Sequence, residues 1–150
     1  MDLILWRHAE AEDGAPDAAR QLTAKGEKQA QKIAKWLKER IEKPVRILVS
    51  PTVRTQQTAQ ALNLKFETEA EVGVNSSPRK ILQATGWPHT EGTVIVVGHQ
   101  PTLGQLAAFF LSGEEADWDI KKGAVWWFEA QGKGDAAEAS LRAVIAPKEV

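Results

Sequence analysis

The stretch that decides the fold is LILWRHAE, residues 3–10. Its first four residues are apolar, and Arg7 and His8 follow them directly. A short apolar run bounded by polar residues is typical of a strand buried on both faces of a parallel sheet. Arg7 and His8 therefore stand where a buried strand ends, a position at which two polar side chains need a function or a partner.

The same design occurs twice more in the chain. The run ILVSPTVR, residues 47–54, leads to Arg54, and the run VIVVGH, residues 94–99, leads to His99. In open α/β sheets, ligands bind in the crevice at the C-terminal ends of the strands. We therefore expect the three polar strand ends to meet in one pocket.

Strands and helices alternate along the rest of the chain. Strand patterns cover residues 3–7, 45–49, 64–68, 93–97, 124–129 and 139–145. Helical patterns cover residues 23–43, 52–62, 78–84 and 101–111. This alternation predicts an α/β fold, a three-layer α/β/α sandwich with a mostly parallel central sheet of about six strands and an antiparallel edge. We expect a single domain over residues 1–150, because no repeat or linker interrupts the pattern.

Capping residues set the expected helix boundaries. Thr23 can cap the first helix, and Pro44 marks its end. Ser50 followed by Pro51 is a typical helix start, with serine at the cap and proline at the first helical position. We therefore expect Ser50 to cap the second helix and not to act as a nucleophile.

Composition excludes several classes of protein. The chain has 150 residues, a net charge of -1 and no cysteine. This balance does not favour a nucleic acid or membrane partner, and the lack of cysteine removes disulfides and thiolate chemistry. We expect no secretory signal, no membrane segment and a cytoplasmic location. We interpret five lysines of the first helix as its solvated face: Lys25, Lys28, Lys32, Lys35 and Lys38.

Two arginines at strand ends favour an anionic ligand. The planar guanidinium groups of Arg7 and Arg54 match phosphate oxygens bidentately. The helices expected to start at Pro51 and Pro101 direct free N–H groups and partial positive charge to the same place. Arg20, in the first loop, either reaches the same anion or only pairs with a nearby acid. A dianionic phosphoryl group is the ligand that this environment favours most.

A histidine at the centre of such a site can act as a nucleophile. Neutral imidazole attacks phosphorus and forms a covalent intermediate. Arg7, Arg54 and a protonated His99 would supply the electrostatic stabilisation that phosphoryl transfer needs, so we expect no metal and no other cofactor. The surrounding cations also favour the unprotonated form of His8 at neutral pH.

Four motifs resemble those of the histidine phosphatase superfamily, the phosphoglycerate mutase-like proteins. They are RHAE at 7–10, RQLTAKG at 20–26, SPTVRTQQTA at 50–59 and GH at 98–99. The resemblance implies that His8 is the nucleophile that becomes phosphorylated. It also implies that Arg7, Arg54 and His99 bind the phosphoryl group. Ala9 stands in place of the glycine in the family's Arg-His-Gly motif.

The short chain and the motif at 20–26 look most like the SixA-type branch, which removes phosphate from phosphohistidine on a protein. The resemblance thus implies a phosphorylated protein as substrate and inorganic phosphate as product. Three alternatives stay open. They are a small-molecule phosphomonoesterase of the same superfamily, a non-catalytic module that binds phospho-ligands, and a metallohydrolase. The two arginines speak against the last, because cations repel a metal ion.

The motifs do not assign the proton donor. Glu69 and Glu71 stand after the third expected strand, where the resemblance implies that larger members carry an acid. Glu10 in the first loop is another candidate, with Glu12 and Asp17 as its rivals. A phosphohistidine substrate leaves as imidazole, which demands less of an acid.

Overall fold

A computed structural model describes residues 1–150, apart from the side chain of Ala136. One six-stranded sheet crosses the molecule in the order β3-β2-β4-β1-β5-β6. The strands are β1 (Asp2–Arg7), β2 (Val45–Val49), β3 (Glu67–Thr68), β4 (Thr93–Gly98), β5 (Val125–Gln131) and β6 (Glu138–Ile145). The first four strands run parallel, whereas β5 pairs antiparallel with β1 and with β6. The expected α/β sheet with an antiparallel edge is confirmed.

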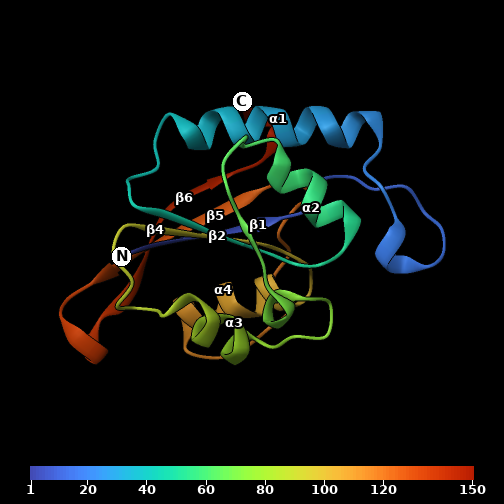
Figure 1. Cartoon of the computed structure of the whole chain (residues 1–150). Helices are drawn as coiled ribbons and strands as arrows, with labels where there is room; N and C mark the ends of the chain where they lie inside the picture. Colours follow the sequence, from blue (N-terminus) through green and yellow to red (C-terminus); the bar gives the residue numbers. More distant parts are fainter.

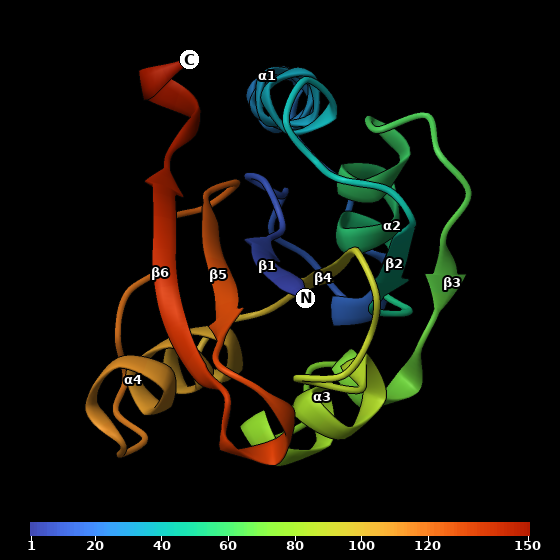
Figure 2. The same cartoon turned by 90° about the vertical axis from the view of Figure 1, so that its left-hand side faces the viewer.

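Helices cover both faces of this sheet (Figure 1 and Figure 2). The helices are α1 (Ala24–Lys38), α2 (Val53–Gln60), α3 (Pro78–Thr85) and α4 (Thr102–Ser112). Helices α1 and α2 lie on one face, and α3 and α4 lie on the other. Short 3-10 turns occupy Asp17–Ala19, Ala70–Val72, Gly134–Ala136 and Pro147–Glu149. Within the described chain, no helix has the length and apolar character needed to span a bilayer.

Alternation along the strands divides the core between the two helical layers. Leu3 and Leu5 of β1 pack on the side of α3 and α4, whereas Ile4 and Trp6 pack on the side of α1 and α2. All four side chains are fully buried. Burial on both faces explains why this strand appears in the sequence as a continuous apolar run.

Strand β4 lies between β1 and β2, so three parallel strands end side by side. Gly98 stands opposite Arg7 in the register. The pairing continues one step beyond the strands, because the N–H of His8 donates to the Gly98 carbonyl at 3.1 Å and the N–H of Ser50 donates to the Val97 carbonyl at 3.1 Å. The residues that follow β1, β2 and β4 are thus held together at one edge of the sheet.

Three elements are shorter than the sequence pattern predicts, among them α2, which ends at Gln60 and not at residue 62. Helix α1 ends at Lys38, before the expected boundary at residue 43. The N–H of Ile41 still donates to the Leu37 carbonyl, so an irregular turn keeps Ile41 against the core after the helix has ended. Strand β3 contains only Glu67–Thr68, because the residues expected to begin it do not pair with β2.

The capping predictions have mixed outcomes. Thr23 caps α1 as expected, since its side-chain oxygen accepts the N–H of Gly26 at 2.9 Å. Ser50 does not cap α2, because Thr52 is the residue that precedes this helix and its side chain makes no capping hydrogen bond. The Ser50 side chain is directed instead to a histidine of the candidate site.

Candidate active site

His8 follows β1 directly and is nearly buried, with 8% of its surface exposed. Its Nδ1 lies 2.8 Å from the carbonyl oxygen of Ala9. A carbonyl oxygen can only accept, so this contact places the ring proton of the neutral imidazole on Nδ1 and leaves the lone pair on Nε2. The N–H of Ala9 donates to Thr58 Oγ1 at 3.1 Å, which fixes the peptide that orients His8.

His99 follows β4 and packs beside His8, with ring centroids 5.4 Å apart. Its Nε2 lies 2.8 Å from Oγ of Ser50, and its Nδ1 lies 3.4 Å from Nη2 of Arg54. A guanidinium only donates, so Nδ1 accepts and Nε2 carries the proton in the neutral ring. Sequence reasoning missed this role of the fully buried Ser50, because serine before proline is also the signal for a helix start.

Arg54 lies in the first turn of α2 and is buried. Its Nη1 donates to the backbone carbonyl of Asp17 at 2.9 Å, and its Nη2 donates to the Asp17 carboxylate at 3.1 Å. Its buried Nε has no hydrogen-bond partner among the described residues. Buried donors are normally paired, so this Nε lacks the partner that a buried donor usually has.

Arg7 reaches from the end of β1 to the loop that precedes β5. Its Nη1 donates to the carbonyl of Ile120 at 2.8 Å. Burial lowers the pKa of Arg7, and the charge of Asp119 on the same loop raises it. The buried Nε of Arg7 also has no partner in the part of the chain that the structure describes. Arg7 is therefore held from one side and keeps an unused donor.

Arg20 and Asp17 form an ion pair at the outer edge of the site. Nη1 of Arg20 donates to the Asp17 carboxylate at 3.0 Å, and its Nε donates to the Glu12 carbonyl at 2.7 Å. The side-chain hydrogen bond from Arg20, followed by that from Arg54, lowers the pKa of Asp17. Of the two roles that the sequence allows for Arg20, the structure shows the pairing with Asp17.

Both imidazoles are neutral in these surroundings. Burial, followed by the charges of Arg54 and Arg7, lowers the pKa of His8 to about 4. Burial, followed by the neighbouring His8 and Arg54, lowers the pKa of His99 to about 3. The neutral His8 agrees with expectation, although burial and not charge is the main cause. Removing the His99 ring from water opposes its charged form, so the protonated His99 expected beside a phosphoryl group stays a prediction.

The three candidate acids have different surroundings. Oε2 of Glu10 accepts a hydrogen bond from Thr23 Oγ1 at 2.8 Å, at the start of α1. Glu69 continues the edge beyond β3, with its N–H donating to a β2 carbonyl at 2.8 Å. Glu71 is exposed and lines a hollow of about 450 Å³ that also includes Ser50. Glu71 is thus the candidate that shares a cavity with a residue of the site.

The structure brings Arg7, His8, Arg54 and His99 to one edge of the sheet. Two guanidinium groups with spare donors suit a phosphate dianion, which accepts several charge-assisted hydrogen bonds at once. Over the described residues, no three His, Asp or Glu side chains cluster as metal ligands do. The arrangement can bind a phosphoryl group and present an unprotonated imidazole to it.

Comparison with known proteins tests this interpretation. The model of the histidine phosphatase superfamily (branch 1) matches residues 3–75. The phosphohistidine phosphatase SixA homolog of Haemophilus influenzae is 36% identical over 124 residues, which cover 72% of this chain and 76% of that protein. This chain belongs to the histidine phosphatase superfamily.

Further relatives place this histidine phosphatase near the SixA proteins. Phosphohistidine phosphatase SixA of Escherichia coli is 32% identical over 127 residues, which cover 76% of each chain. A solved structure of the protein histidine phosphatase SixA in complex with tungstate superposes with a TM-score of 0.81 at 27% identity, covering 99% of this chain and 98% of that one. The histidine phosphatase fold therefore extends over nearly the whole chain.

Proposed function

We propose that this histidine phosphatase removes the phosphoryl group from phosphohistidine on a protein, through a phosphohistidine intermediate on its own His8. The observation that carries the proposal is the buried His8 with Nδ1 engaged by the Ala9 carbonyl, because this leaves Nε2 unprotonated beside two arginines. A nucleophile for phosphorus needs that lone pair, and the low pKa of His8 keeps it available at neutral pH.

In the first step, Nε2 of His8 forms a bond to phosphorus while the P–N bond of the substrate breaks. The electron pair of that bond goes to the substrate imidazole, which takes up a proton as it leaves. The three candidate donors of this proton are Glu10, Glu69 and Glu71, or water in their place. We favour Glu71, because it lines the hollow that adjoins Ser50.

Arg7, Arg54 and His99 bind the transferring phosphoryl group. The guanidinium groups of both arginines supply charge-assisted hydrogen bonds to its oxygens. Burial favours neutral His99, and the negative charge of a bound phosphoryl group favours its protonated form. These groups act by positioning and electrostatic stabilisation, which provide most of the catalysis in phosphoryl transfer.

In the second step, water attacks phosphorus of the phosphorylated His8. The bond to Nε2 breaks, its electron pair returns to the imidazole, and inorganic phosphate is released. The tungstate complex of the related SixA supports this part of the proposal, because tungstate is a tetrahedral oxyanion like phosphate. The cycle uses no metal and no other cofactor.

The names of the relatives favour a protein substrate. Two of them are called phosphohistidine phosphatase SixA or its homolog. The segment between β3 and β4 is short and contains only a 3-10 turn and α3, so it offers little material to enclose a small substrate. A single-domain, cytoplasmic protein that binds neither nucleic acid nor membranes remains our expectation.

The proposal is tested by turnover of a phosphohistidine-bearing protein against a panel of small phosphomonoesters, each measured with and without excess chelator. We expect the phosphoprotein to be hydrolysed with the highest kcat/KM and no effect of chelator. Faster hydrolysis of a small phosphoester would establish the alternative, a small-molecule phosphomonoesterase. Saturable binding without phosphate release would indicate a non-catalytic phospho-ligand module.

A further inference from the structure

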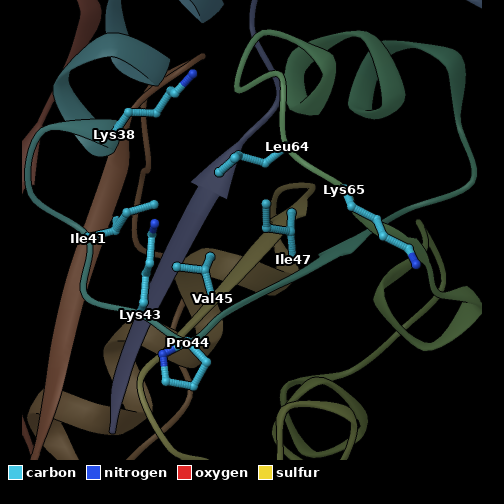
Figure 3. Close-up of a pocket in the computed structure, with 8 residues that line it drawn as sticks. All are labelled: Lys38, Ile41, Lys43, Pro44, Val45, Ile47, Leu64 and Lys65. Carbon is cyan, nitrogen blue, oxygen red and sulfur yellow. The ribbon is translucent and has the colours of Figure 1, made fainter.

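A second cavity lies at the opposite end of β2 from the candidate active site. It has a volume of about 800 Å³ and is lined by the irregular turn after α1, the start of β2 and the segment that leads to β3 (Figure 3). Ligand cavities in proteins have about this size and are mostly apolar, with a few polar groups. Val45 and Ile47 of β2 line it, whereas Ser50 beyond the other end of the strand belongs to the candidate active site.

The wall of this cavity is apolar. Ile41, Val45, Ile47 and Leu64 contribute to it, and Leu64 is 39% exposed. Strand β3 pairs with β2 only at Leu48 and Val49, so the segment before Glu67 passes the first half of β2 without joining the sheet. An alkyl chain that entered the cavity would therefore remove apolar surface from water.

Lysines surround the apolar wall. Figure 3 shows Lys43 extending beside Ile41, with Lys38 and Lys65 on opposite sides of the group. These three ammonium groups form no ion pair with a carboxylate among the residues described. The nearby Glu67 is already held by Arg46, through bonds of 2.7 and 3.1 Å. The charges of Lys38 and Lys43 are thus open to an external anion, whereas the charge of Lys65 also acts on Glu67.

We propose that this cavity binds an anionic amphiphile, a single-chain carboxylate. The alkyl chain lies against Ile41, Val45 and Leu64, and the carboxylate pairs with Lys43. An inorganic anion would leave the apolar wall exposed, and a neutral alkyl chain would leave the lysines without a partner. A ligand with an alkyl chain and a carboxylate covers the apolar wall and also pairs with a lysine. Burial of the alkyl chain supplies affinity, and the charge pair fixes the orientation of the ligand.

Fluorescence of dansyl-undecanoate in the presence of the whole protein tests the proposal. We expect saturable binding of one probe, displaced by decanoate but neither by decanol nor by acetate at the same concentration. Lys43→Glu and Leu64→Glu should each weaken binding at least about tenfold, since they reverse the charge or place a charge on the apolar wall. Lys28→Glu, on the solvated part of α1, makes the same charge change outside the cavity and should bind as the wild type does.

Thermal unfolding of each variant shows that it is folded, independently of any enzymatic activity. A folded wild type with no saturable binding would overturn the proposal. So would displacement by decanol as effective as that by decanoate, or a loss in Lys28→Glu equal to that in Lys43→Glu. Failure of the phosphatase proposal would leave these readouts unaffected, because none of the variants touches the strand ends that form the candidate active site.

Discussion

One exposed carboxylate, that of Asp17, holds the buried guanidinium of Arg54. Asp17 Oδ2 lies 3.1 Å from Nη2 of Arg54, and the two side chains are 56% and 5% exposed. The backbone carbonyl of Asp17 accepts a second hydrogen bond from the same arginine at 2.9 Å. An anion that binds Arg54 must therefore share it with a negative charge that is already present.

The first prediction concerns Asp17→Asn. This change keeps the side-chain shape and the backbone hydrogen bond to Arg54, but it removes the negative charge beside the anion site. We expect phosphate and tungstate to inhibit roughly threefold to fivefold more strongly, a modest gain because Asp17 is exposed to solvent. Asp13→Asn, at an exposed position in the same loop, should leave inhibition unchanged. Weaker inhibition in Asp17→Asn would show that the carboxylate is needed to position Arg54.

Gly26 offers a test of how the first loop is fixed to α1. A Cβ at this position would lie 2.0 Å from the backbone oxygen of Glu10, so a side chain fits here only if the backbone moves. Alanine gains up to about 1 kcal/mol of helix propensity over glycine. Overpacking against a backbone atom costs more, so Gly26→Ala should lower the free energy of unfolding by about 2 kcal/mol net.

Urea denaturation of Gly26→Ala measures this loss. Lys25→Ala, at the exposed neighbouring position, is its control and should stay within about 0.5 kcal/mol of the wild type. A Gly26→Ala protein as stable as the wild type would mean that the loop at Glu10 moves aside freely.

Substitution of the candidate acids distinguishes their roles. We expect Glu71→Gln to lower kcat for a phosphohistidine protein by about tenfold, less than the 10²–10⁴ of a demanding acid-catalysed step, because imidazole is a readily protonated leaving group. Glu10→Gln should change kcat little, since the Glu10 carboxylate is hydrogen-bonded to Thr23. Steady-state rates of both variants and of Glu69→Gln show which of the three carboxylates donates the proton. A larger loss in Glu10→Gln or Glu69→Gln than in Glu71→Gln would reassign the proton donor.

The two buried imidazoles make stability depend on pH. The pKa of His8 falls to about 4 in the folded protein, from an ordinary value of 6.5. Protonation therefore favours the unfolded chain. The stability that the neutral ring contributes is complete above pH 6.5, decreases as the pH falls toward 4, and is lost below it. His99 acts in the same direction, with a pKa of about 3.

Denaturant unfolding between pH 7 and pH 4 tests this linkage. The wild type should lose more stability over the interval than His8→Asn, by up to roughly 3 kcal/mol. Equal pH dependence in the two proteins would mean that His8 is not buried as described.

The sequence predicted which residues meet at the strand ends better than it predicted the loop contacts around them. Strand ends could be read from apolar runs that stop at a polar residue, and parallel pairing then brings Arg7, His8 and His99 together. The motif order indicated the family, which the comparisons confirm. Each of these signals lies within a few consecutive residues, where local pattern and chemistry coincide.

Contacts between loops that are far apart in the sequence could not be predicted from local sequence patterns. The bridge from Asp17 to Arg54 depends on the path of an irregular loop, which no periodic pattern specifies. Ser50 was expected to cap a helix, and only the approach of β4 to β2 reveals its contact with His99. The early end of α1 was hidden because Ile41 keeps the apolar spacing through a turn that is no longer a regular helix.

The most direct test of the mechanism is a rapid quench under alkaline conditions, after mixing the protein with a substrate labelled with ³²P on histidine. We expect labelled, acid-labile phosphate on the wild-type chain, mapped to His8 by peptide analysis. His89→Ala, which removes an exposed histidine paired with Asp135, should be labelled as the wild type is. Folded His8→Ala should carry no label and release no phosphate. Full turnover by His8→Ala, or label mapped to another residue, would contradict the assignment of His8 as the nucleophile.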